Sequence, residues 1–257
     1  MAFYRREGDA LVPTPNCIGP WHPELQHGGP PAALLAGAAE RFGEDGSSFV
    51  VVRVTVELLR PIGFHPLTIR VTPIRLGRQA QWLQADLMSD GRHLARATVV
   101  RIAGSDLTLP QRTRPEPSPP GPEGLPGFVF PFFQAEEGYH HAVELRIAEG
   151  AWAEGPCTAW MRPKFPLIEG ETSSPLETVM ILADATNGIA PALPTDAFTF
   201  VNPDLTVHLR RPLEGDWLAL AARSVAEPIG TGLVQSRLFD RGGEIGHCLQ
   251  SLVVRAR

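Results

Sequence analysis

The 257-residue sequence lacks several features that would place it in a class at once. Its three cysteines, Cys17, Cys157 and Cys248, are widely spaced and form no Cys-x-x-Cys pair, so neither a disulfide framework nor a zinc site is predicted. No apolar run approaches the ~20 residues of a membrane span, and the N-terminus has no apolar signal segment. We therefore expect a cytoplasmic protein with no membrane span.

Clustered positive charge is also absent. The formal net charge at pH 7 is −5, from 23 Lys and Arg against 28 Asp and Glu, and the basic residues are dispersed along the chain. Nucleic-acid binders concentrate positive charge because they neutralise phosphates, so nucleic acid is not an expected partner. With 43% hydrophobic residues, the chain has enough apolar material for one large core or two smaller ones.

Common motifs for covalent catalysis, phosphate binding and metal binding are missing too. There is no Gly-x-Ser-x-Gly, no Walker-type loop and no His-Glu-x-x-His. The adjacent His140 and His141 are expected on opposite faces of a strand, which argues against a shared metal ion. The sequence predicts no metal site and no cofactor.

Proline is abundant in one segment, residues 104–127, which holds seven prolines. Proline is excluded from helix interiors and central strands, and proline-rich chain favours an extended conformation. We interpret this segment as a linker between an N-terminal unit, residues 1–103, and a C-terminal unit, residues 128–257.

The sequences on the two sides of the linker resemble each other. Arg53–Pro61 matches Asp204–Pro212 at Thr, Val, Leu, Arg and Pro with an offset of 151 residues. Leu94–Arg101 similarly matches Cys248–Arg255, and each follows a Gly-containing turn. Matches in the same order at nearly constant offset indicate an internal duplication.

Each half predicts one apolar helix followed by four strands. Pro30 and Pro31 suit the first turn of a helix over Ala32–Phe42, and Ser174 suits the cap of a helix that runs to Gly188. The predicted strands are Phe49–Leu59, Leu67–Leu76, Gln81–Ser89 and Leu94–Ile102, then Thr199–Leu209, Trp217–Val225, Gly232–Asp240 and Glu244–Val254.

Shorter strands are expected to extend each sheet ahead of its helix: Phe3–Arg6 and Leu11–Pro13, then His141–Ile147 and Thr158–Met161. The predicted fold class is α+β, with two curved antiparallel sheets, each wrapped around one central helix.

The sequence His27-Gly28-Gly29 stands just before the first predicted helix. Free N–H groups and the positive end of the helix dipole stabilise negative oxygen there, and glycine lets a ligand carbonyl approach the backbone closely. On these residues alone, a tight turn that leads into the helix explains the pattern equally well.

Three polar residues stand in apolar surroundings in the second half. Asp184 lies in the second predicted helix, four residues after Met180, and a buried carboxylate costs several kcal/mol unless it is paired. Asp184 is therefore a candidate general base, unless it lies at the edge of the apolar face and reaches solvent. Gln250 in the final strand and Asn202 before Pro203 are candidate partners, or alternatively core amides with satisfied hydrogen bonds.

Together these residues resemble the double-hotdog acyl-CoA thioesterase II family. Single-hotdog members have His-Gly-Gly at the start of the central helix and a catalytic Asp nine residues after that His. Here the position nine after His27 is Ala36, whereas Asp184 has Pro175 nine residues before it. The resemblance thus implies one composite site per chain, with the loop from the first half and the acid from the second.

In double-hotdog members an Asp, a Thr and a Gln of the second half hold a water. The resemblance assigns Asp184 and Gln250 to the Asp and Gln roles. It places Asn202 at the Thr position, with Thr206 as the alternative.

The resemblance implies an acyl-CoA thioesterase, without a cofactor, that hydrolyses fatty acyl-CoA to free acid and CoA. His27, Gly28 and Gly29 would form the oxyanion site, and the protein could assemble as a homo-oligomer. The departure at Asn202 favours an alternative, a non-catalytic double-hotdog protein that binds acyl thioesters or lipids. An acyl tunnel is expected between the two central helices and the sheet. Four phenylalanines are candidates for shaping it, or for core packing: Phe128, Phe130, Phe132 and Phe133.

Overall fold

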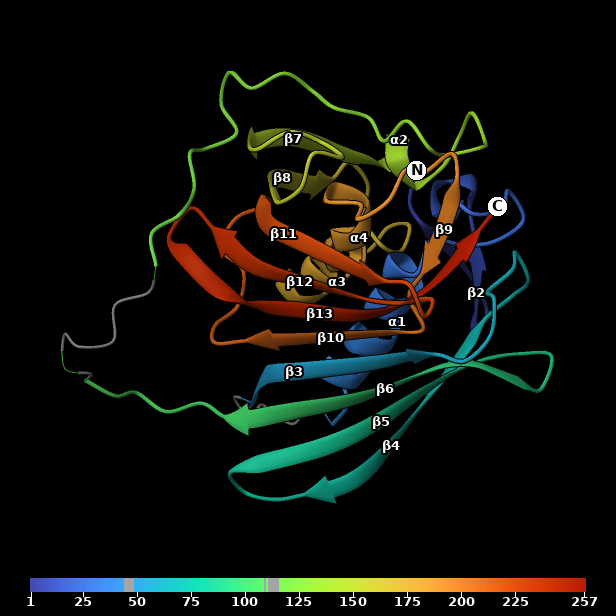
Figure 1. Cartoon of the computed structure of the whole chain (residues 1–257). Coiled ribbons are helices and arrows are strands. Elements are labelled where there is room, and N and C mark those ends of the chain that lie inside the picture. The colour runs from blue at the N-terminus through green and yellow to red at the C-terminus, as the bar shows by residue number, and fades with distance from the viewer. Residues whose placement is uncertain (44–48, 109, 111–115) are drawn as a thin grey trace.

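The computed structural model describes residues 1–43, 49–108, 110 and 116–257. It shows one broad antiparallel sheet that curves around two central helices (Figure 1). The strand order is β4-β5-β6-β3-β10-β13-β12-β11-β8-β7, and β9 pairs with β13 beside this path. The strands are β3 (Phe49–Leu58), β4 (Thr68–Leu76), β5 (Ala80–Ser89), β6 (Arg92–Ala103), β7 (Val143–Glu149), β8 (Cys157–Pro163), β9 (Phe198–Val201), β10 (Asp204–Leu209), β11 (Leu218–Glu227), β12 (Thr231–Asp240) and β13 (Gly243–Ala256).

The sheets of the two halves, expected separately, join edge to edge through β3 and β10. Thr55 of β3 pairs with Thr206 of β10, and their Oγ1 atoms lie 3.4 Å apart. These threonines are related by the 151-residue offset of the repeat, so the pseudo-twofold axis of the duplicated fold passes between them. The chain is a double hotdog whose two sheets are continuous.

The central helices α1 (Gly29–Glu40) and α3 (Pro175–Ala183) lie against each other on the concave side of the sheet (Figure 1). They run antiparallel, because Gly29 at the start of α1 meets Ile181 near the end of α3, while Gly37 meets Glu177. A Cβ at either glycine would overlap the facing oxygen. Glycine at these two positions therefore permits the close helix contact.

The second central helix ends earlier than the sequence predicted. It stops at Ala183, with Asp184 as its C-cap, and the chain continues into a separate short helix, α4 (Thr186–Ile189). Thr186 Oγ1 donates to the Ala183 carbonyl oxygen at 2.7 Å and so satisfies one carbonyl that the helix leaves free at its end. The expectation of Asp184 in a helix interior is therefore wrong, because Asp184 stands at the helix terminus.

The N-terminal strands β1 (Tyr4–Glu7) and β2 (Ala10–Pro13) form a separate two-stranded hairpin and do not extend the first sheet as expected. Single bridges connect this hairpin to both halves, from Tyr4 to Ile168 and from Leu11 to Leu67. The 3-10 helix η1 (Pro15–Cys17) follows it. In the second half, β7 and β8 do extend the sheet.

The His140–His141 pair lies in the short helix α2 (Tyr139–Ala142), not in a strand. Their ring centroids are 4.1 Å apart, so the expectation that they point to opposite faces is wrong. Burial, together with His141, lowers the pKa of His140 to about 4. The ring of His140 also stacks on Phe133.

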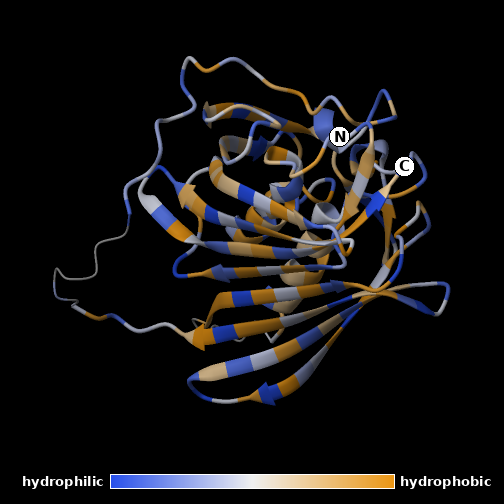
Figure 2. Ribbon diagram, in the orientation of Figure 1, coloured by the Kyte–Doolittle hydropathy of each residue, from blue (hydrophilic) through white to orange (hydrophobic). Residues whose placement is uncertain are grey.

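Hydrophobic and hydrophilic residues alternate along many strands of the sheet (Figure 2). The described part of the linker packs on the second half, where Pro120 and Pro122 carbonyls accept hydrogen bonds from Trp160 and Arg146. In the described ranges, no helix is long and apolar enough to cross a membrane.

Candidate active site

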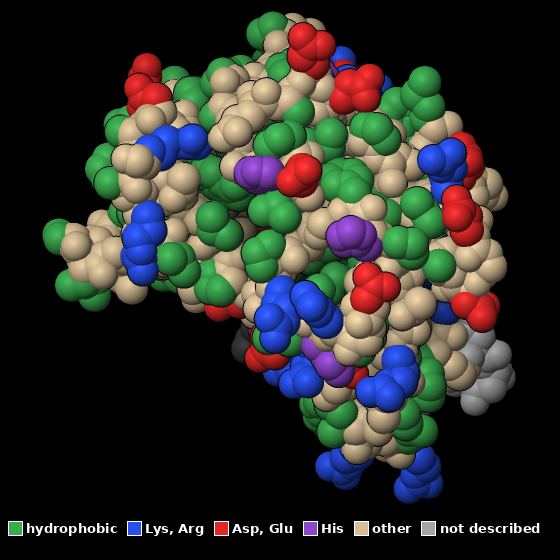
Figure 3. Space-filling model, turned by 90° about the vertical axis from the view of Figure 1, so that its right-hand side faces the viewer, with side chains coloured by type: hydrophobic (Ala, Val, Ile, Leu, Met, Phe, Trp, Pro, Cys, Tyr) green, Lys and Arg blue, Asp and Glu red, His purple; other side chains and the backbone are tan. Residues whose placement is uncertain are grey.

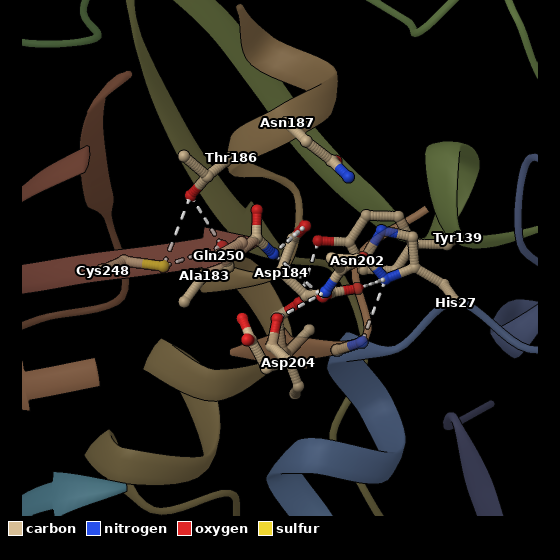
Figure 4. Close-up of polar contacts among 12 residues, drawn as sticks. His27, Tyr139, Ala183, Asp184, Thr186, Asn187, Asn202, Asp204, Cys248 and Gln250 are labelled. Carbon is tan, nitrogen blue, oxygen red and sulfur yellow. Dashed lines mark hydrogen bonds and ion pairs between the residues drawn. The ribbon is translucent and has the colours of Figure 1, made fainter. Parts of the chain in front are cut away.

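The carboxylate of Asp184 lies at the centre of a buried polar cluster (Figure 4). Its Oδ1 accepts hydrogen bonds from Asn202 Nδ2 at 2.8 Å and from Gln250 Nε2 at 3.1 Å. Gln250 Nε2 also donates to the Asp184 main-chain carbonyl at 3.1 Å. Because two amides hold Oδ1, the other oxygen, Oδ2, is the one that faces the first half of the chain.

Asn202 reaches Asp184 because the chain breaks its strand pairing there. Proline lacks an N–H and restricts the preceding residue to extended conformations, so Pro203 separates β9 from β10. The second N–H of Asn202 Nδ2 donates to the Asp204 carbonyl at 3.1 Å. The alternative residue, Thr206, has its hydroxyl against Thr55 at the sheet junction. Of the two, the structure brings Asn202 to Asp184.

Gln250 comes from β13, where alternate residues are buried, and its side chain is fully buried. Its Oε1 has no hydrogen-bond partner among the described residues. The first-half counterpart in the repeat, Arg96, instead donates to the buried Asp86 at 3.2 Å. A buried amide at this position of the repeat is therefore present in the second half and not in the first.

The His27-Gly28-Gly29 loop leads into α1 and lies against the end of α3. A Cβ on Gly28 would come within 2.8 Å of Asp184 Oδ2, which is closer than real Cβ contacts. A Cβ on Gly29 would overlap the Ile181 carbonyl. Glycine at both positions is thus what allows the loop of the first half and the acid of the second half to be neighbours.

His27 lies between the loop and the acid. Its Nδ1 is 3.1 Å from Gly29 N and 3.2 Å from Asp184 Oδ2. Burial lowers the pKa of His27, and the carboxylate of Asp184 partly opposes this shift. In a neutral ring, Nδ1 either accepts from Gly29 N–H or donates to Asp184, because it cannot do both at once.

Tyr139 holds this histidine in place, and sequence reasoning missed it. Its ring stacks on His27 with centroids 3.7 Å apart and planes 1° from parallel. Its hydroxyl donates to the Ile181 carbonyl at 2.9 Å, and burial raises its pKa well above the usual value. One isolated tyrosine after the linker gives no pattern from which this contact could be predicted.

A cavity of about 410 Å³ opens beside the polar cluster. His27, Gly28, Asp184 and Asn202 line it, whereas Gln250 stands behind Asp184. Asn187 of α4 also lines the cavity, and it was not among the residues predicted from the sequence. Its walls are otherwise largely apolar, and include Trp21, Leu58, Ile62, Val201, Pro203 and Val253.

The four phenylalanines after the linker do not line this cavity. Phe130 and Phe132 pack against Gly188 of α4, and Phe132 stacks on Trp152. Phe133 stacks on His140. They pack in or against the hydrophobic core.

The place related to this site by the pseudo-twofold axis has no counterpart of Asp184, since Ala36 stands nine residues after His27. It is filled by side chains from the start of α3. Glu177 is buried and accepts a hydrogen bond from Arg41 Nη1 at 2.6 Å. Ser174 Oγ donates to Glu40 Oε2 at 2.6 Å. Within the described residues, no three His, Cys, Asp or Glu side chains gather as a metal site requires.

Models of two known domains match the chain. The model of the acyl-CoA thioesterase N-terminal domain matches residues 18–102, and that of the acyl-CoA thioesterase C-terminal domain matches residues 110–254. A search of curated proteins gave no match.

Several solved structures share the fold over almost the whole chain. A proposed thioesterase from Novosphingobium aromaticivorans is 20% identical, with a TM-score of 0.75 and 98% of each chain covered. A hot-dog-fold protein of unknown function from Alicyclobacillus acidocaldarius is 19% identical, with a TM-score of 0.73 over 99% of this chain and 95% of that one. The acyl-CoA thioesterase II TesB2 from Mycobacterium marinum is 17% identical, with a TM-score of 0.68 over 90% and 91%. Because the two domain models together match most of its length, the chain belongs to the acyl-CoA thioesterase family.

Proposed function

We propose that this protein is an acyl-CoA thioesterase that hydrolyses fatty acyl-CoA to the free acid and CoA. One observation carries the proposal: Asp184 Oδ2 lies beside Gly28 at the wall of an apolar cavity, while Asp184 Oδ1 is held by Asn202 and Gln250. A base from the second half and a backbone donor from the first half thus meet at one place where an acyl group fits. Membership of the family supports the same activity.

The reaction is a single displacement by water. Asp184 Oδ2 accepts a proton from the water as its oxygen attacks the thioester carbonyl carbon. Negative charge develops on the carbonyl oxygen, and the Gly28 N–H, which has no acceptor in the described part of the chain, donates to it. Collapse restores the C=O bond and breaks the C–S bond. CoA leaves as a thiolate and takes the proton from Asp184.

The two amides act on the base rather than on the substrate. Their N–H groups stabilise the charge of a carboxylate that is only 4% exposed, and they fix its rotation so that Oδ2 faces the cavity. General-base assistance contributes ~10²–10⁴-fold to the rate, and an oxyanion donor ~10²–10³-fold.

The test is thiol release by the purified protein from acyl-CoAs of short, medium and long chain, compared with Asp184→Asn. Asparagine keeps the shape and can still accept at its Oδ1, so the fold is expected to persist while turnover falls at least ~10²-fold. Asp196→Asn, at an exposed loop position, is the matched control and is expected to retain full activity.

Equal release by the wild-type protein and Asp184→Asn would mean that another group is the base. Binding of acyl-CoA without release from any chain length would replace the enzyme by a protein that binds acyl thioesters. Calorimetric titration with a non-hydrolysable acyl-CoA thioether distinguishes that outcome from loss of folding.

A further inference from the structure

Two side-chain amides in the cavity wall have no part in the proposed reaction, Gln26 and Asn187. Gln26 is bonded at both ends, since its Oε1 accepts from the Tyr4 hydroxyl and its Nε2 donates to the Gly63 carbonyl, which leaves Asn187. It lies on α4, three residues after Asp184, on the far side of the break that ends α3. Its side chain is 8% exposed and lines the same cavity as Asp184, Gly28 and Asn202. Figure 4 shows it extending from α4 toward the group of polar side chains around Asp184.

The other two amides near the acid have no N–H left to give. Asn202 Nδ2 donates to Asp184 Oδ1 and to the Asp204 carbonyl. Gln250 Nε2 donates to Asp184 Oδ1 and to the Asp184 carbonyl. An amide nitrogen carries two N–H bonds, so each of these nitrogens already uses both of them in hydrogen bonds within the second half of the chain.

The start of α1 also offers few free backbone N–H groups as hydrogen-bond donors. Pro30 and Pro31 have no N–H, and the N–H of Ala32 already donates to the Gly28 carbonyl within the helix. The Gly29 N–H donates to His27 Nδ1 at 3.1 Å, so a substrate oxygen would have to displace this hydrogen bond. Gly28 N–H is the remaining backbone donor at this helix start, and an oxyanion is best stabilised by two donors.

We propose that Asn187 Nδ2 is the second donor to the thioester carbonyl oxygen, beside the Gly28 N–H. This inference rests on the proposed thioesterase function. The recorded hydrogen bond of Asn187 Nδ2 goes to the Phe200 carbonyl at 3.5 Å, well beyond the usual 2.9–3.0 Å. Such a contact is weak, and the second N–H of the same nitrogen stays available.

Placement and chemistry both suit this role. Asp184 and Asn187 flank the α3–α4 break, so the base and the donor are set by the same turn of backbone. A neutral amide donates a hydrogen bond without competing for the proton that Asp184 must accept. Asn187 would touch the reacting carbonyl and would thus be a catalytic residue.

The test compares steady-state thiol release by the wild-type protein, Asn187→Ala and Asn187→Asp on one medium-chain acyl-CoA. Loss of one oxyanion donor is expected to lower kcat by ~10²–10³-fold in Asn187→Ala, with KM changed less than about 3-fold. Asn187→Asp places a carboxylate against the oxyanion and is expected to be less active still. Asn16→Ala, an amide whose Nδ2 binds the Ala2 carbonyl away from the cavity, is the matched control.

A pH–rate profile separates this role from an effect on the base. If Asn187 stabilises the oxyanion, Asn187→Ala lowers kcat at every pH and leaves the midpoint of the profile unchanged. A shifted midpoint, or a kcat within about 5-fold of wild type in a folded variant, overturns the inference while the thioesterase function stands. Absence of thiol release from every substrate by the wild-type protein overturns both. Asn187→Ser, which keeps a short donor, provides a second variant if Asn187→Asp does not fold.

Discussion

His27 Nδ1 lies 3.2 Å from Asp184 Oδ2, although the two residues are 157 positions apart and belong to opposite halves of the duplicated fold. The contact exists because Gly28 and Gly29 allow the loop before α1 to lie on the end of α3. It gives the chain one site built from both halves.

Alanine at the two loop glycines is expected to have different effects. In Gly29→Ala the new Cβ overlaps the Ile181 carbonyl, so α1 and α3 must separate at a cost of about 1–3 kcal/mol in the free energy of unfolding. In Gly28→Ala the Cβ meets Asp184 Oδ2, so activity should fall more than stability. Urea denaturation and thiol release measure the two effects. Gly127→Ala, which has open space around it, is the control, and a fully active Gly28→Ala would contradict the model of the site.

Asn202 is expected to tolerate a hydroxyl better than an apolar side chain. Asn202→Leu removes the 2.8 Å hydrogen bond to Asp184 Oδ1 and is expected to lower kcat by about 10- to 100-fold, since a hydrogen bond to a charged group contributes ~1.5–3 kcal/mol. Asn202→Thr restores a donor and should recover much of that loss. Steady-state kinetics of the two variants gives the comparison. Equal activity of Asn202→Thr and Asn202→Leu would show that the hydrogen bond has no part in turnover.

His140 is expected to make the fold acid-sensitive. Its pKa is lowered from 6.5 to about 4 because the ring is buried beside His141, so below pH 6.5 the unfolded chain binds a proton that the folded chain does not. Its contribution to stability is complete above pH 6.5 and is lost as the pH falls toward 4, by up to ~1.4 kcal/mol per pH unit. The lowered pKa of the buried His27 adds in the same direction.

Urea denaturation between pH 4 and pH 7 measures this slope. His140→Gln is expected to reduce it, and His208→Gln, at an exposed position of β10, should leave it unchanged. An unaltered slope in His140→Gln would assign the acid sensitivity to other groups.

Arg60 is expected to contribute to binding of the CoA part of the substrate. It is exposed at the boundary between the site cavity and a second cavity of about 980 Å³, whose wall also includes His65 and Arg92. Figure 3 shows Lys and Arg side chains gathered in the lower part of the face that lies on the right in Figure 1. Positive charge beside the site favours a substrate with phosphates.

Arg60→Gln is therefore expected to raise KM for acyl-CoA about 5-fold, the equivalent of ~1 kcal/mol, with kcat unchanged. An acyl-pantetheine thioester, which lacks the nucleotide phosphates, should not distinguish Arg60→Gln from wild type. Arg70→Gln, an exposed arginine of β4, is the control. A KM that rises equally for both substrates would rule out contact with the phosphates.

Local patterns allowed the two central helices and most strands to be predicted. Strands such as β5 and β12 begin and end within one residue of the predicted ranges, because alternation of apolar and polar residues is visible in the sequence itself. The early end of α3 was not predictable, because Ala183 and Ala185 both favour a helix and the hydroxyl of Thr186 competes for its last carbonyls only in the folded chain. The pairing of the N-terminal hairpin likewise depends on residues far away in sequence, Leu67 and Ile168.

The polar cluster was predictable in composition but not in geometry. Asp184, Asn202 and Gln250 stand out as polar residues in apolar surroundings, and the structure brings all three together. Nothing in the sequence indicates that both amides bind the same carboxylate oxygen. Tyr139 and Asn187 carry no motif, and only the folded backbone places them beside the site.

The junction of β3 with β10 has a consequence for how the protein behaves on dilution. In a dimer of separate hotdog chains, a site that takes its loop from one chain and its acid from the other falls apart as the concentration drops. Here the residues 104–127 tether the two halves, so their association is intramolecular, with an effective concentration on the order of millimolar. The two parts of the proposed site therefore stay together at any protein concentration.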